Sequence, residues 1–200
     1  MTLYRDTFRI ESTRLRYWDY ADYGWYFITI CVQNHECVLG KIVDGVIQPT
    51  PAGRIVEQEL LRTIRRRPEA ELDMWCIMPN HLHLILVVDN LIKQRKQSPV
   101  SSTSTVPYEE PEPVAKLEAR SLGSVINRFK NNATKRIRKS ILPAFEWQER
   151  FHDHVIRNEK ELQSIREYIL QNPGAWEEDE YHPRHSMAIN NPTGNGIHSL

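Results

Sequence analysis

Two histidines stand two positions apart within the stretch MPNHLHLILVVDN, which spans residues 78–90. The stretch otherwise has the composition of a buried β-strand, in which successive side chains point to opposite faces. His81 and His83 are therefore expected to share one face, while the alternating leucines point into the core. Two neutral imidazoles this close together can chelate a divalent cation through their ring nitrogens. The alternative is a pair of surface histidines whose spacing has no chemical role.

Two ligands make a weak metal site, and a later segment offers a third. Asn158 begins a pattern typical of a capping box, and an amphipathic helical pattern follows it. Tyr168 and Asn172 lie four residues apart and so share a face of that helix, which Pro173 is expected to end at Asn172. An amide oxygen there could complete a His-His-Asn ligand set, with a phenol one turn before it. Taken singly, such a tyrosine is usually core and such an asparagine usually a helix stop.

The charges are segregated although the formal net charge is zero. Residues 119–139 hold seven Lys or Arg and no acid, and residues 62–67 add four arginines, whereas acids collect at 108–113 and 177–180. A block of like charge on a helix creates a local positive field, and nucleic acid is the commonest partner for such a field. The alternative is a solvated basic helix face.

Composition indicates one soluble globular domain, since 40% of the 200 residues are hydrophobic and 26% are charged. The first twenty residues carry scattered charges and no apolar stretch, so we expect no secretory signal, and no later run is long enough to span a bilayer. Three scattered cysteines predict free thiols in a reducing compartment. The expected location is the cytoplasm.

The pattern of elements predicts an α+β fold. Strands are expected at 24–34, 71–78, 81–88 and 145–156, a hairpin with an Asp44-Gly45 turn at 40–49, and helices from Pro51, across the basic stretch and from Asn158. This order suggests a ferredoxin-like sandwich, an antiparallel sheet with helices on one face plus a C-terminal helix carrying the tyrosine. The histidines would then lie on the open face.

The expected domain covers residues 1–180. Within it, the Ser-, Thr-, Pro- and Glu-rich stretch at about 93–116 lacks apolar periodicity and is expected to be a mobile insert. Residues 181–200 are expected to form a disordered tail.

The block MPNHLHLILV resembles the HUH motif of single-tyrosine transposases, and the chain as a whole is similar to their REP-associated (RAYT) branch. Further segments carry the resemblance over roughly residues 18–176: GKIVDGVIQPTPAG, LGSVINRFKNNATKRI and WQERFHDHVIRNEKELQSIREYILQNP. By position, His81 and His83 match the metal ligands and Tyr168 the nucleophile. Asn172 matches the polar residue that completes the metal site. The block containing Trp147, Gln148, His152, Asp153 and His154 is typical of the branch, without assignable roles.

The resemblance implies metal-dependent cleavage and joining of single-stranded DNA through a 5′-phosphotyrosine link, with Mg²⁺ or Mn²⁺ as cofactor and hairpin-forming repeats as target. A phenol with its usual pKa of about 10 needs nearby positive charge or a proton acceptor to attack, which a cation would provide. Phosphate contacts are expected from basic side chains that position the strand without reading it. These side chains are Arg128, Lys130, Lys135, Arg136 and Arg138, with Arg65, Arg66 and Arg67. The N-terminal Tyr4, Arg5, Arg9, Arg14 and Arg16 are further candidates.

Two other interpretations stay open at this point. A histidine-triad nucleotide hydrolase would need a third histidine where this chain has Ile85. A non-catalytic, sequence-specific single-stranded DNA-binding protein would need the same surface without the chemistry. Assembly is open between a monomer and a homodimer that exchanges the tyrosine helix.

Overall fold

The structure is a computed structural model that describes residues 3–4, 7–8, 23–89 and 121–185. The predicted insert at 93–116 and the residues after 185 lie outside these ranges, as do Arg5, Arg9, Arg14 and Arg16. The strands and helices are β1 (Leu3–Tyr4), β2 (Thr7–Phe8), β3 (Gly24–Cys31), β4 (Gly40–Val43), β5 (Val46–Pro49), α1 (Pro51–Arg65), β6 (Ala70–Ile77), β7 (His81–Val88), α3 (Leu122–Ser140), β8 (His152–Ile156) and α4 (Glu159–Gln171). Short 3₁₀ turns occur at Gln33–His35 and Trp176–Glu178.

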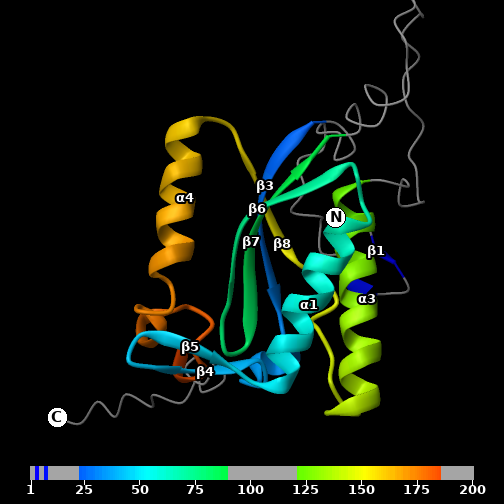
Figure 1. The fold of residues 1–200 in the computed structure, drawn as a ribbon, viewed down its shortest axis with the longest axis vertical. Helices are drawn as coiled ribbons and strands as arrows, with labels where there is room; N and C mark the ends of the chain where they lie inside the picture. Colours follow the sequence, from blue (N-terminus) through cyan, green and yellow to red (C-terminus); the bar gives the residue numbers. More distant parts are fainter. Residues whose placement is uncertain (1–2, 5–6, 9–22, 90–120, 186–200) are drawn as a thin grey trace, which may run out of the picture.

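A four-stranded sheet in the order β6-β7-β3-β8, antiparallel throughout, forms the centre of the fold (Figure 1). In chain order the four strands of this sheet and helices α1 and α3 run strand, helix, strand, strand, helix, strand, with β3 and β7 innermost. This is the ferredoxin-like arrangement, so the predicted fold class is confirmed. The predicted strand at 145–156 is shorter than expected: β8 begins at His152, and before it only Trp147 bridges to Val32.

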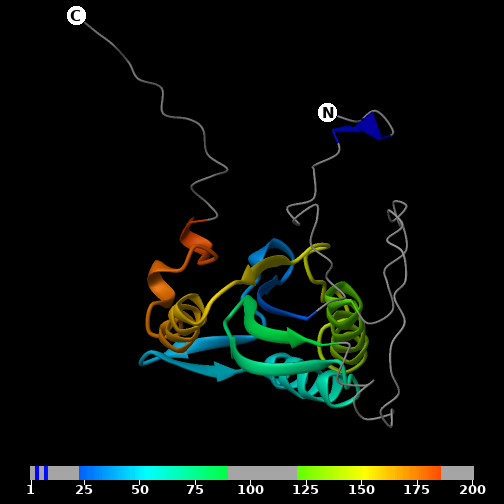
Figure 2. The ribbon, with the colours of Figure 1, turned by 90° about the horizontal axis from the view of Figure 1, so that it is seen from above.

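Helices α1 and α3 pack side by side on one face of the sheet (Figures 1 and 2). Each begins with a capped amide: the Thr50 hydroxyl accepts from Gly53 and the Ser121 hydroxyl accepts from Ser124. Gly53 admits no side chain, because a Cβ there would lie 2.0 Å from the Leu39 carbonyl oxygen. The buried faces of both helices join the alternating leucines of β7 in one large apolar cluster.

The opposite face of the sheet is covered as well. Helix α4 lies across it, and the chain then turns back through residues 176–185 (Figure 2). A smaller apolar cluster forms there from Ile85, Ile156, Leu162 and Ile169. The expectation that the histidines lie on an open face is therefore wrong: His81 and His83 are 0% and 1% exposed.

The β4–β5 hairpin matches its prediction. Asp44 and Gly45 have φ values of 52° and 73°, the left-handed pair that a two-residue hairpin turn requires. The three cysteines are unpaired, as predicted. Among the described residues, no helix combines the length and apolarity needed to cross a membrane.

Candidate metal and nucleophile site

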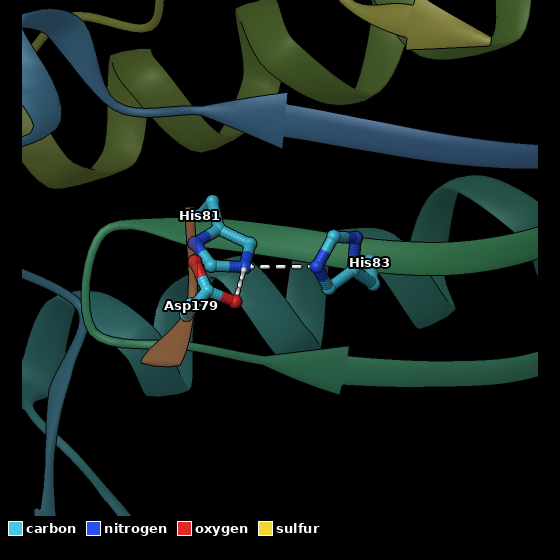
Figure 3. Close-up of side chains that lie close together, drawn as sticks. All are labelled: His81, His83 and Asp179. Carbon is cyan, nitrogen blue, oxygen red and sulfur yellow. Dashed lines mark hydrogen bonds and ion pairs between the residues drawn. The ribbon is translucent and has the colours of Figure 1, made fainter. Parts of the chain in front are cut away.

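The two histidines of β7 face one another through the same ring atom. Their Nε2 atoms lie 2.9 Å apart, and both rings stand on the face of the sheet away from α1 and α3 (Figure 3). Protein ligands bind Zn²⁺ with metal–nitrogen bonds of about 2.0–2.1 Å, so two nitrogens at this spacing can reach one cation. The predicted shared orientation of His81 and His83 is confirmed.

Each imidazole is held through its other nitrogen. The Nδ1 atom of His81 lies 2.8 Å from the Asn80 side-chain oxygen, which can only accept a hydrogen bond. The Nδ1 atom of His83 lies 2.9 Å from the Thr29 hydroxyl. A proton on both Nδ1 atoms leaves both Nε2 lone pairs facing the shared space, which is how outer partners orient metal-binding histidines.

Both imidazoles are kept neutral by their surroundings. Burial lowers the pKa of His83 to about 3. Burial also lowers the pKa of His81, and the neighbouring His83 and His35 lower it further. Since a protonated imidazole cannot ligate a metal, neutral rings suit cation binding over the whole ordinary pH range.

Asp179 adds a carboxylate that the sequence did not suggest. Its Oδ2 atom lies 3.8 Å from the His81 Nε2 atom, and His81, His83 and Asp179 each offer a ligand atom within 4.8 Å of the others. All three are buried. Asp179 belongs to the acidic run at 177–180 that the charge pattern had identified. The sequence therefore showed the carboxylate, but it did not show that this run folds back over the histidines.

Asn172 lies next to this cluster, beside Tyr168 and Asp179. It caps the end of α4, is 3% exposed, and its Oδ1 atom is buried without a hydrogen-bond partner. Burial raises the pKa of both Tyr168 and Asp179, and hydrogen bonds from the Asn172 side chain offset part of that rise. A buried oxygen without a partner is costly unless a ligand satisfies it. Two neutral imidazoles and a carboxylate therefore fit a divalent cation, and the amide oxygen of Asn172 is left without a partner beside Asp179.

Tyr168 lies at the edge of the same cluster. Its hydroxyl is 3.4 Å from the His83 Nε2 atom, while the residue stays 42% exposed. Burial, and after it the charge of Asp179, raise the pKa of this phenol. A raised pKa is unfavourable for a nucleophile, so the phenol needs a cation beside it to ionise.

A second tyrosine covers the histidines from the returning chain. The ring centroid of Tyr181 is 4.9 Å from that of His81, and the ring stacks on His35 at 5.5 Å. The Asn80 amide nitrogen donates to the carbonyl oxygens of Tyr181 and His35, at 2.7 and 3.0 Å. Asn80 thus joins the returning chain to the metal side of β7.

His35 is placed by an unusual stretch of backbone. Asn34 and His35 have φ values of 55° and 53°, in the left-handed region that side chains other than glycine rarely adopt. The His35 Nε2 atom lies 2.9 Å from the Gln148 side-chain nitrogen. Gln148, part of the block at 147–154, therefore helps to hold the His35 ring against Tyr181.

The candidate DNA-contacting side chains lie in the helical layer, on the opposite face of the sheet from Tyr168. Arg128 and Lys135 are exposed on α3, and Arg65 and Arg66 are exposed at the end of α1. Four others are engaged within the protein. Arg67 bonds Ser124 and Glu69, Arg136 bonds Glu59 and Gln58, Arg138 bonds Phe145 and Glu146, and the buried Lys130 ammonium donates to the carbonyls of Gln148 and Glu149.

The remaining residues of the block at 147–154 divide between the two faces. His152 and His154 pair across the sheet with Thr29 and Phe27, whose side chains lie on the metal-site face. Both imidazoles are exposed, and His154 pairs with Glu161 of α4 at 2.7 Å. Trp147 packs into the large apolar cluster instead.

The chain is similar to another protein in sequence and to a solved structure in fold. No protein-family model matches it. It is 35% identical over 170 residues to a Haemophilus influenzae (strain ATCC 51907 / DSM 11121 / KW20 / Rd) protein described as uncharacterized, covering 85% of this chain and 91% of that protein. Among solved structures, it is similar to a REP-associated tyrosine transposase bound to a REP hairpin, with 22% identity, a TM-score of 0.53, and coverage of 83% of this chain and 74% of the other.

The chain thus shares the fold of the REP-associated tyrosine transposase, and the resemblance seen in the sequence is confirmed at the level of the fold. At 35% identity over 85% of its length, it belongs to the same family as the Haemophilus influenzae protein.

Proposed function

We propose that this protein is a metal-dependent, single-stranded DNA nuclease and strand-transferase of the HUH type that uses Tyr168 as its nucleophile. The observation that carries the proposal is the position of the Tyr168 hydroxyl, 3.4 Å from the inward nitrogen of His83. That nitrogen belongs to a buried His-His-Asp cluster with a cation's preferred ligands. The phenol is exposed enough for a DNA strand to approach it.

The chain's own groups would divide the work between them. His81, His83, Asp179 and the Asn172 amide oxygen would hold a divalent cation. Imidazole nitrogens with carboxylate and amide oxygens suit Mg²⁺ or Mn²⁺ in an open site better than a closed structural zinc site. When bound, such a cation supplies positive charge beside the phenol and the scissile phosphate.

Tyr168 would attack the scissile phosphorus through its phenol oxygen. One bond forms from that oxygen to phosphorus, and the bond from phosphorus to the 3′ oxygen breaks, leaving a 5′-phosphotyrosine and a free 3′-hydroxyl. The phenol proton passes to solvent, and the departing oxygen takes one up. One phosphodiester replaces another, so the strand can be rejoined without nucleotide hydrolysis.

For the substrate, we propose a hairpin-forming repeat, the kind of DNA bound by the solved structural neighbour. The exposed Arg65, Arg66, Arg128 and Lys135 would contact phosphates of the folded part of that DNA. These side chains lie on the face of the sheet covered by α1 and α3, so the scissile strand would have to pass around the edge of the sheet to reach Tyr168. Phosphate contacts of this kind make binding dependent on salt.

The test is formation of a covalent adduct. Purified protein is incubated with single-stranded repeat DNA and Mn²⁺, and the adduct is resolved on a denaturing gel. Wild-type protein should form it, EDTA should prevent it, and Tyr168→Phe should abolish it while still binding the DNA. Tyr181→Phe is the matched control, since Tyr181 also lies over the histidines, and this variant should keep forming the adduct.

Binding without any adduct, in wild type and variants alike, would favour a non-catalytic DNA-binding protein. Cleavage that persists in EDTA would remove the role of the metal.

A further inference from the structure

A second hollow opens beside the histidines, and Tyr168 is not among the residues that line it. It is a cavity of about 350 Å³ lined by Phe27, Thr29, His152, Asp153, His154, Glu180 and Tyr181. Its size is at the small end of the roughly 300–1,000 Å³ that ligand pockets span. The proposed function gives no role to His152 or His154.

This hollow, which we call the β8 pocket, is continuous with the candidate site. The Thr29 hydroxyl that lines it also bonds His83, at 2.9 Å. Phe27 stacks on the His83 ring at 5.3 Å, and Tyr181 lies 4.9 Å from the His81 ring. Anything bound in the β8 pocket would therefore be next to the rings of His81 and His83.

The lining suits a nucleobase with a polar edge. Phe27 and Tyr181 offer aromatic surface, on which bases of any sequence can stack. His152 and His154 stand two residues apart on the same face of β8 and present imidazoles at the rim. Imidazole nitrogens can donate to or accept from the edge of a base. The ring of His154 is already engaged with Glu161, which leaves His152 as the more available group.

The position of the pocket indicates which nucleotide it takes. A separate hollow of about 420 Å³ is lined by Tyr168, Asn172 and Asp179 among others, and it shares only Glu180 with the β8 pocket. In phosphoryl transfer the attacking and leaving oxygens lie roughly in line on opposite sides of phosphorus. Tyr168 lines the first of these hollows and not the β8 pocket, so the strand that becomes joined to Tyr168 would occupy the first hollow, and the leaving 3′ oxygen would lie toward the β8 pocket.

We propose that the β8 pocket binds the nucleotide on the 3′-hydroxyl side of the cut, with its base on the aromatic surface and His152 at its edge. This inference rests on the proposed function, because it requires Tyr168 to be the attacking group. It adds a binding site to that function, and it assigns the pocket to the leaving strand rather than to the strand that becomes joined to the protein.

The experiment uses the full chain with Mn²⁺ and three repeat substrates after the cut has been mapped with wild-type protein. One substrate is intact, one lacks the base on the 3′-hydroxyl side, and one lacks the base on the tyrosine-linked side. For wild type, loss of the first base should lower kcat/KM about 5- to 150-fold, the range expected for one stacked base, mainly through KM.

His152→Ala should lower kcat/KM on the intact substrate and show a smaller penalty for the missing base on the 3′-hydroxyl side. Its penalty for the other missing base should match that of wild type. Lys160→Ala, an exposed change on the outer part of α4, is the control and should leave all three values unchanged.

Equal losses for His152→Ala on all three substrates would overturn the pocket assignment, as would a penalty confined to the tyrosine-linked base. In both cases the adduct still forms, so the proposed function would stand. If wild-type protein forms no adduct with any of the substrates, the proposed function fails and the pocket assignment fails with it.

Discussion

The two faces of strand β7 are buried to the same degree but are built for different purposes. On one face Leu82, Leu84 and Leu86 are fully buried in the large apolar cluster under α1 and α3. On the other, His81 and His83 are equally buried, yet each ring has a specific partner for its Nδ1 atom. Burial by itself therefore does not distinguish core from site, whereas the partners do.

The covering layers differ in the same way. Two long helices cover the leucine face and contribute apolar side chains along their length. The histidine face is covered by a smaller apolar cluster and by the turn at 176–185, which brings Asp179 and Tyr181 over the imidazoles. The first face should thus determine stability, and the second should determine chemistry.

One substitution on each face should separate the effect on stability from the effect on activity. Leu84→Ala should lower the free energy of unfolding by about 2–5 kcal/mol, since it leaves a cavity in the main core. His83→Gln should cost only about 1 kcal/mol, because an amide can keep a hydrogen bond to Thr29, but it should abolish the adduct. Urea unfolding and the denaturing gel measure the two effects. Comparable stability losses, with activity retained in His83→Gln, would remove the distinction.

Asn80 tests whether the histidine face depends on its outer partners. Asn80→Ala removes the acceptor that orients His81 and the donor to the carbonyls of His35 and Tyr181, so Mn²⁺ affinity should fall about 10- to 100-fold. Calorimetric titration of Mn²⁺ measures the fall, and a higher Mn²⁺ concentration should restore the rate of adduct formation. Asn131→Ala, exposed on α3, is the control. Unchanged affinity in Asn80→Ala would mean that Asn80 does not position His81.

Lowering the pH should reduce the stability of the fold, because the folded protein keeps the rings of His81 and His83 neutral. The pKa of His83 is lowered to about 3 and that of His81 is lowered as well, in both cases mainly by burial. In the unfolded chain, where histidine pKa values are near 6.5, these rings bind protons that they do not bind in the folded protein. The contribution to stability is therefore complete above about pH 6.5 and is lost as the pH falls below it. The expected loss is about 1.4 kcal/mol per pH unit for each ring.

Urea unfolding of chelator-treated protein between pH 7 and pH 5 measures this slope. Burial raises the pKa of Asp179, which acts with the opposite sign at lower pH, so the range stops at pH 5. His83→Gln should remove one ring's share of the slope. An equal slope in that variant would show that the His83 ring is not held neutral.

Local pattern was enough to predict most of the fold. The alternation in β7, the Asp44-Gly45 turn and the Thr50 and Asn158 caps depend on neighbours in the chain, and each lies where the sequence indicated. The pairing of Tyr168 with His83 was also predicted, because the spacing of Tyr168 and Asn172 put both on one helix face and the family resemblance put that face beside the histidines.

What the sequence did not predict depends on the chain folding back. Asp179 and Tyr181 follow α4 in a turn without periodicity, and only the structure shows that they cover His81. The buried position of the histidines was missed for the same reason. The sequence predicts Lys130 to be a basic surface residue, yet its ammonium donates hydrogen bonds to two backbone carbonyls. Both carbonyls belong to the loop before β8, whose path the sequence did not show.

The most direct measurement of the central claim is the identity of the residue joined to DNA. The adduct formed with Mn²⁺ is digested with protease and nuclease, and mass spectrometry locates the residue that carries the nucleotide phosphate. We expect that phosphate on Tyr168, in the peptide of α4. Its presence on Tyr181, the other tyrosine over the histidines, or on any other residue would contradict the account.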